Sequence, residues 1–149
     1  MIIESLKELF NRDLIKLKTE IELYNDEKTL WATENSINNS GGNLCLHLIG
    51  NLKTYIGNGL ADNGYKRNRN FEFTGKFVSR EQLYQEIDET IVIVDKGLST
   101  LKEEQLSEKF PLIIWEEKTE MAFTLIHLHS HLNYHVGQIN YHRRILENI

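Results

Sequence analysis

Cysteine and proline are almost absent from this sequence, and both shortages limit what kind of protein it can be. Cys45 is the single cysteine and Pro111 the single proline among 149 residues. One cysteine can form neither an internal disulfide nor a thiolate cluster of the zinc-finger type, and this fits a reducing compartment. One proline leaves three long stretches before it and one after it free of the strongest helix breaker. The composition therefore favours helix.

Long apolar runs and an excess of positive charge are also missing. No apolar stretch approaches the roughly 20 residues of a membrane span, and Met1–Glu4 meets charge too early for a signal peptide. Seventeen Lys and Arg stand against 22 Asp and Glu, so the net charge of −5 offers phosphates no general attraction. We expect a cytoplasmic protein that binds neither membrane nor nucleic acid. The one basic run, Lys66–Arg69, we interpret as a solvated loop.

The balance of residues is that of a globular protein, with 40% apolar and 26% charged residues. A second domain would leave each half of a chain this short below a comfortable length for its own core. We therefore expect one domain over residues 1–149.

Apolar residues recur every three or four positions in four long segments, the period of amphipathic helices. These segments lie at residues 3–24, 44–61, 79–101 and from about 119 to beyond 146. The apolar run at 110–115 is expected to be a short extended segment that covers one end of the core. Four long antiparallel helices with two longer connections predict an all-α protein, a four-helix bundle.

Two of these helices have clear start signals. Ser79 followed by Gln82 fits a capping box, and Val78 with Leu83 fits a hydrophobic staple. Ser40–Asn43 supplies a break and a cap before the second helix. We therefore expect the third helix to begin at Ser79.

Four of the six histidines gather in residues 127–135 of the last expected helix. At about 100° per residue, His127, His131 and His135 form one stripe, whereas His129 points to the far side. Gln138 and His142 continue this stripe. Apolar neighbours place it on or beside the inward face.

Histidines four residues apart on a helix can bind one ion together. His127 and His135 are about 12 Å apart along the helix axis and cannot readily share it. A single ion therefore takes either His127 with His131 or His131 with His135. The third ligand must come from another element, and His47, in an otherwise apolar run of the second helix, is the candidate.

Several other motifs are excluded by inspection. No glutamate lies three residues before any histidine, as the ferritin-like di-iron pattern requires. His131 is followed by leucine and not by the glutamate of a zinc-protease helix. Gly57–Asp62 lacks the third glycine of a dinucleotide fingerprint, and the apolar neighbours of Cys45 favour an inert buried thiol over a nucleophile.

The most specific patterns in the chain are Leu46–Leu52 in the second helix and His131–Ile139, with its His-x-x-x-His-x-Gly-Gln-Ile order, in the fourth. Together they resemble the DinB-like superfamily, and most closely its small bacterial branch of unknown function. The resemblance extends over nearly the whole chain. It implies an up-down-down-up four-helix bundle, commonly a homodimer, that holds a divalent metal, often nickel or zinc, on three histidines. Carried over by position, these ligands are His47, His131 and His135.

Two further residues of the stripe have no assigned ligand role. His127 has no counterpart in the superfamily motif, and we interpret it as a catalytic residue that lines the pocket; a core or surface histidine is the alternative. Gln138 lies one turn beyond His135 and is expected either to orient a ligand ring or a bound water, or to pack as a helix amide.

Three neutral imidazoles leave a divalent ion with open positions, where bound water or a thiol becomes a nucleophile. The resemblance implies a metal-dependent hydrolase or a transferase that uses a low-molecular-weight thiol, acting on a small-molecule substrate. No Asp or Glu lies on the stripe as a general base, and this tilts the prediction toward thiol transfer.

A non-catalytic bundle that binds metal or a small ligand in a stress response is the alternative. A pocket lined by His47, His127, His131 and an aromatic residue such as Trp31 or Trp115 would favour an enzyme. Ligands sealed in the core would favour a structural role.

Overall fold

The structure is a computed structural model that describes residues 1–149, and its regular elements are all helical. Two isolated bridges are the only β-type pairings. The long helices are α1 (Ile2–Leu23), α3 (Gly41–Leu52), α6 (Arg80–Ser99) and α7 (Met121–Leu146). The short elements are α2 (Glu27–Leu30), a π-helical segment (Lys53–Asn58), α4 (Gly59–Ala61), α5 (Arg69–Thr74) and a 3-10 turn (Glu103–Ser107). The predicted all-α class is confirmed.

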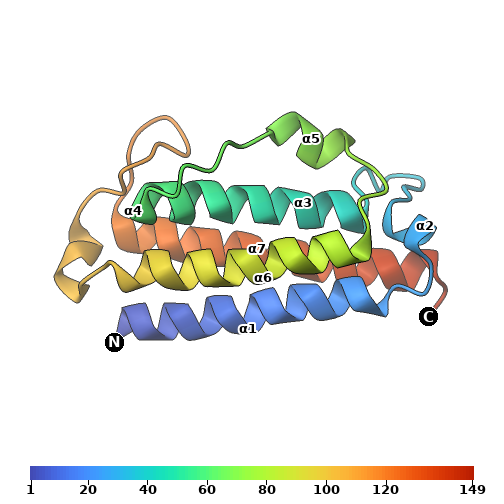
Figure 1. Cartoon of the computed structure of the whole chain (residues 1–149), viewed down its shortest axis with the longest axis horizontal. Helices are drawn as coiled ribbons and strands as arrows, with labels where there is room; N and C mark the ends of the chain where they lie inside the picture. Colours follow the sequence, from blue (N-terminus) through green and yellow to red (C-terminus); the bar gives the residue numbers. More distant parts are fainter.

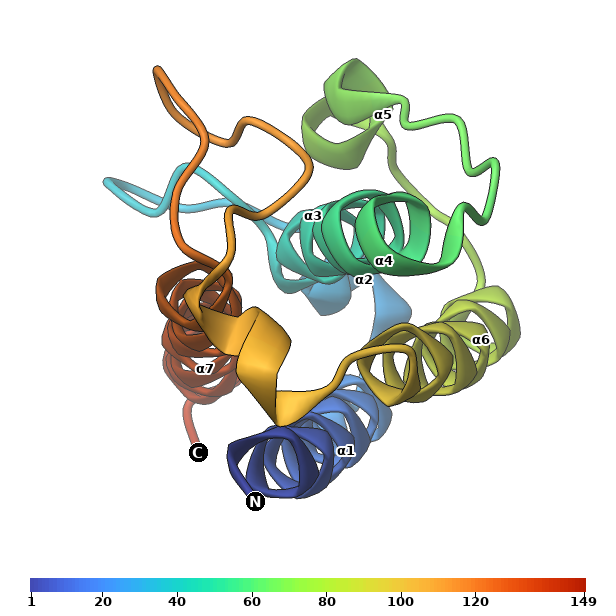
Figure 2. The ribbon, with the colours of Figure 1, turned by 90° about the vertical axis from the view of Figure 1, so that its left-hand side faces the viewer.

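The four long helices lie side by side along the long axis of the molecule (Figure 1). α1 packs against α6 and α7, and α3 packs against the same two helices. α1 and α7 run in one direction in Figure 1, whereas α3 and α6 run in the other. The end-on view in Figure 2 shows the four helices around a common centre, with α5 on the outer side of α3. No helix combines the length and the apolar character needed to cross a membrane.

Apolar side chains from all four long helices fill that centre, among them Phe10, Leu48, Leu83 and Leu132. α3 differs from the other long helices because nearly all of its residues are buried. The short helix α5 packs on α3 and covers the face that would otherwise meet solvent. A histidine in the middle of α3 is therefore enclosed from both sides.

The predicted helix starts agree with the structure. The Ser79 hydroxyl oxygen accepts a hydrogen bond from the Gln82 backbone N–H at 3.2 Å, and Ser40 caps α3 in the same way through Asn43 at 3.1 Å. Only half of the predicted capping box forms, because the Gln82 side chain donates to Glu86. Each serine satisfies a backbone donor that the first helical turn leaves without a partner.

α7 begins two residues later than the predicted start near Thr119. The Phe110 N–H donates to the Thr119 carbonyl at 2.8 Å, and the Met121 N–H donates to the Glu108 carbonyl at 2.7 Å. These bonds hold Thr119 and Glu120 extended against the preceding strand-like segment, so they cannot form a helical turn. Phe110 is fully buried there, but Ile113 and Trp115 are exposed and most of the 110–115 run forms bends, so the expected extended segment over the core is only partly present.

The connection between α4 and α6 departs most from the sequence-based expectation. It contains α5, which no three- to four-residue apolar period in the sequence predicts. The interpretation of Lys66–Arg69 as a solvated loop holds for Lys66 and Asn68, which are exposed, but Arg69 already begins α5 and Arg67 is not solvated. The Arg67 guanidinium pairs with the buried carboxylate of Glu72 and is only 15% exposed.

Candidate metal centre

Three histidines from two helices converge on one point. His47 comes from α3, and His131 and His135 lie one turn apart on the neighbouring α7. The Nε2 atom of His131 lies 3.2 Å from Nε2 of His47 and 3.1 Å from Nε2 of His135. Ligand atoms of all three residues lie within 4.8 Å of one another, as a group able to hold a metal ion requires.

This arrangement suits a cation better than it suits three imidazoles alone. A neutral imidazole has one N–H and one free nitrogen lone pair, so three facing nitrogens cannot all be satisfied by each other. Two nitrogens bound about 2.0–2.1 Å from one tetrahedral zinc ion lie about 3.3–3.4 Å apart, and the two short Nε2 separations come within about 0.2 Å of this range. The residues present therefore fit a divalent metal.

His131 and His135 also have the protonation state that a metal requires. Burial, together with the neighbouring histidines, lowers the pKa of His131 to about 3. Burial likewise lowers the pKa of His135, although the hydrogen bond with Gln138 opposes this. Both imidazoles are neutral at neutral pH, and a metal needs the neutral form because it binds the free lone pair.

Two of the three ring nitrogens that face away from the centre meet specific partners. His47 Nδ1 lies 3.0 Å from Glu72 Oε1, and His135 Nδ1 lies 2.7 Å from Gln138 Oε1. The contact of Gln138 matches the first of its two expected roles, the orientation of a ligand ring. His131 Nδ1 is buried and has no hydrogen-bond partner.

Arg67 and Glu72 are the parts of this centre that sequence reasoning missed. Arg67 donates through Nε to Glu72 Oε2 at 2.8 Å and through Nη2 to Oε1 at 2.9 Å. Burial raises the pKa of the Glu72 carboxyl, but hydrogen bonds from His47 and Arg67 outweigh it and lower the pKa. The only signal in the sequence is an arginine five residues before a glutamate, in a connection without periodicity.

His127 lies beside the centre and outside its ligand set. Its ring centroid is 6.1 Å from that of His131 and 4.6 Å from that of Trp115. Of the two pairs left open by the sequence, the structure brings together His131 with His135. Trp115 thus flanks the site through His127, whereas Trp31 is buried in the core.

Residues 2–149 match the family described as "Protein of unknown function (DUF1572)". The chain belongs to that family. A comparison with curated proteins finds no match for it. The family description names no reaction, so the function of this DUF1572 protein has to be argued from its histidines and their partners.

The other polar groups of interest in this DUF1572 protein have structural roles. His129 faces away from the centre, as predicted, and its Nε2 lies 2.7 Å from Oδ2 of the buried Asp13 on α1. His142 is held through both ring nitrogens, by the Tyr24 hydroxyl at 2.6 Å and the Ala32 carbonyl at 2.8 Å. Cys45 is fully buried, and burial raises the pKa of its thiol, which agrees with the predicted inert side chain.

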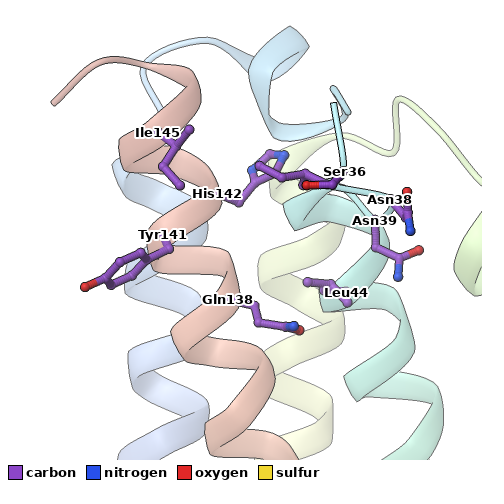
Figure 3. A pocket seen from close by; sticks show the side chains of 9 residues that line it. Ser36, Asn38, Asn39, Leu44, Gln138, Tyr141, His142 and Ile145 are labelled. Atoms are coloured by element: carbon purple, nitrogen blue, oxygen red, sulfur yellow. The ribbon is translucent and has the colours of Figure 1, made fainter. Parts of the chain in front are cut away.

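A cavity of about 330 Å³ lies next to the centre, between α7 and the segment that precedes α3. Figure 3 shows Gln138 and His142 of α7 pointing toward Leu44 and the segment that precedes α3, whereas the Tyr141 ring points to the other side of α7. Gln138 touches His135 on its Nδ1 side. None of the three converging histidines lines this cavity, so Gln138 alone connects it to the centre.

Proposed function

We propose that this DUF1572 protein is a single-domain, DinB-like up-down-down-up four-helix bundle that binds one divalent metal, nickel or zinc. The observation that carries the proposal is the convergence of Nε2 atoms from His47, His131 and His135. The opposite directions of the helix pairs α1 with α7 and α3 with α6 support the topology (Figure 1).

We propose further that the metal centre serves a thiol S-transferase or a hydrolase with a small-molecule substrate, the thiol being one of low molecular weight. A divalent metal on three imidazoles supplies, when bound, a nucleophile from water or from a thiol. His127 lies one turn from His131, where its imidazole can touch a substrate or move a proton without being a ligand. Trp115 beside it offers a flat apolar surface.

Thiol transfer is favoured over hydrolysis by the lack of a free base. Glu72 is the only carboxylate among the hydrogen-bond partners of the three ligands, and it is committed to His47 and Arg67. A thiol needs less help from the protein than water does, because it loses its proton more easily. The same lack of a base supports the second candidate function, a stress-response protein that binds metal or a small ligand without turnover.

We also propose a cytoplasmic homodimer. Large apolar side chains are exposed on α1 and α6, at Ile15, Leu23 and Val92, and these are candidate contacts between subunits. Sedimentation at a protein concentration of roughly tens of micromolar tests the proposed homodimer, and a monomer at that concentration contradicts it.

Elemental analysis of the purified protein tests the metal centre. We expect about one nickel or zinc per chain, and the loss of most of it in His131→Ala. His127→Ala is the matched control, since it removes an imidazole from the same helix and is expected to keep the metal. If His131→Ala retains stoichiometric metal, the assignment of the metal to these three histidines is wrong. If His127→Ala loses metal while His135→Ala keeps it, the ion lies one turn earlier on α7.

A screen of metal-loaded protein against thiols with electrophiles, and separately against esters and amides, then distinguishes the candidate reactions. Turnover of a thiol pair indicates a transferase, and turnover without thiol indicates a hydrolase. Stoichiometric metal with no turnover of either panel favours the binding protein.

A further inference from the structure

The segment between α4 and α6 leaves the bundle and returns across the outer side of α3 (Figures 1 and 2). It carries Glu72, which is 4% exposed, onto His47, a residue 25 positions earlier in the chain. We propose that Glu72 is a positioning residue of the metal centre. Its carboxylate accepts the Nδ1–H of His47 and so keeps the Nε2 lone pair directed at His131 and His135. The inference deepens the proposed function and rests on it.

The contacts around His47 Nδ1 decide which group donates there. Glu72 Oε1 lies 3.0 Å away, whereas the nearest competing donor, Arg67 Nη2, lies 3.5 Å away, at the limit of a hydrogen bond. The same Arg67 nitrogen is 2.9 Å from Glu72 Oε1. The carboxylate oxygen thus accepts from both neighbours, and the single proton of a neutral His47 ring stays on Nδ1. Nε2 is then free to bind a metal.

The carboxylate is itself held on several sides. The fork of Arg67 binds both of its oxygens, a geometry that fixes position as well as charge. The Asn43 side chain on α3 donates to the backbone carbonyls of Glu72 at 3.0 Å and Gly75 at 2.7 Å, which ties the end of α5 to α3. Asn68 caps the start of α5. A short helix whose one buried residue is Glu72 is therefore fastened to α3 by polar groups.

The Glu72 carboxylate lies close to the α3 backbone at Gly50, where the missing side chain leaves space for it. A Cβ atom at this position would lie 2.0 Å from Glu72 Oε2, closer than atoms can approach. Glycine weakens a helix interior, so its presence one turn from His47 needs a reason. The close approach of the Glu72 side chain to the α3 backbone provides that reason.

The first test reads the proton position directly in metal-free protein. Nitrogen-15 NMR of the histidine rings, recorded at about pH 8.5 and so well above the ordinary histidine pKa, reports which nitrogen carries the proton. We expect His47 to carry it on Nδ1 in the wild type and to shift toward Nε2–H in Glu72→Ala. A wild-type His47 protonated on Nε2 overturns the inference.

The second test measures affinity for zinc by competition with a chelator. We expect a loss of about 10- to 100-fold in Glu72→Ala and a smaller loss in Glu72→Gln, which keeps one acceptor oxygen. Gly50→Ala, which displaces the carboxylate without removing it, should lose affinity as well. Two variants serve as controls and should bind as the wild type does. Glu86→Ala removes a carboxylate that pairs with Lys53 and not with a histidine, and Gly137→Ala places a methyl group in open space.

These measurements separate the inference from the proposed function. Zinc affinity equal to that of the wild type in a folded Glu72→Ala overturns the inference and leaves the three-histidine site standing. A wild type that binds neither zinc nor nickel overturns the proposed function, while the ring-proton measurement still decides what Glu72 does to His47. If Glu72→Ala does not fold, Glu72→Gln and Gly50→Ala carry the affinity test.

Discussion

Replacing Asp13 with asparagine tests how α7 is held against α1. Asp13 is fully buried in α1, where its carboxylate accepts hydrogen bonds from Arg12 at 2.8 Å, His129 at 2.7 Å and Asn133 at 2.7 Å. His129 and Asn133 flank the candidate ligand His131 on α7. Their bonds to Asp13 fix the rotation of α7 about its axis, so that the ligand face points to α3.

The magnitude follows from the pKa of Asp13. Burial alone raises it, but hydrogen bonds from Arg12, Asn133 and His129 outweigh burial and lower it from an ordinary 3.8 to about 2. At about 1.4 kcal/mol for each pKa unit, this corresponds to about 2 to 3 kcal/mol of stability. Because the folded-state pKa is depressed, this stability is present above about pH 4 and is lost as the pH falls toward 2.

Urea unfolding of the metal-free wild type and Asp13→Asn, each at pH 7 and pH 3, measures this contribution. We expect the free energy of unfolding of the variant to be about 2 to 3 kcal/mol below that of the wild type at pH 7. This difference should fall by about half at pH 3. Asp95→Asn is the control, because Asp95 is an exposed carboxylate that pairs with Lys7 on α1 and should cost under about 1 kcal/mol. An equal gap for Asp13→Asn at both pH values would refute the electrostatic explanation.

Three further predictions follow from the helices and the site. Ser79→Ala removes the cap of α6 and should cost about 1 kcal/mol in urea unfolding; no change would mean that the bond to Gln82 contributes nothing. Gly137→Ala fills open space on α7 and should raise the free energy of unfolding by about 0.5 to 1 kcal/mol, whereas destabilisation would reveal a contact that the structure lacks. His127→Ala, loaded with metal, should turn over its substrate about 10- to 100-fold more slowly than the wild type, and an unchanged rate would remove His127 from the catalytic residues.

The helices could be read from the sequence because local interactions decide them. The three- to four-residue apolar period predicts α1, α3, α6 and α7, and the serines at positions 40 and 79 form the caps that were expected of them. A cap and its partner lie three residues apart, so they meet whatever the rest of the chain does. α7 begins two residues later than the apolar period predicts, because Thr119 and Met121 bond to Phe110 and Glu108, which only the folded chain brings near.

The candidate site likewise depends partly on local sequence and partly on tertiary structure. The four-residue spacing of His131 and His135 on one helix brings their rings together by helix geometry alone. The same spacing allows His127 with His131. The position of His47 on α3 decides between the two pairs, because His47 lies against His131 and His135 and not against His127.

Arg67, Glu72 and Asp13 belong wholly to the tertiary structure. In the sequence they are ordinary charged residues, and the basic run around Arg67 has the composition of a solvated loop. Glu72 and Asp13 are buried because partners far along the chain offset the cost of removing a charge from water: Glu72 meets His47, and Asp13 meets His129 and Asn133. Arg67 is half-buried because it pairs with Glu72. Local patterns carry no information about such partners, since the packing of α5 on α3 and of α7 on α1 alone brings them within hydrogen-bond distance.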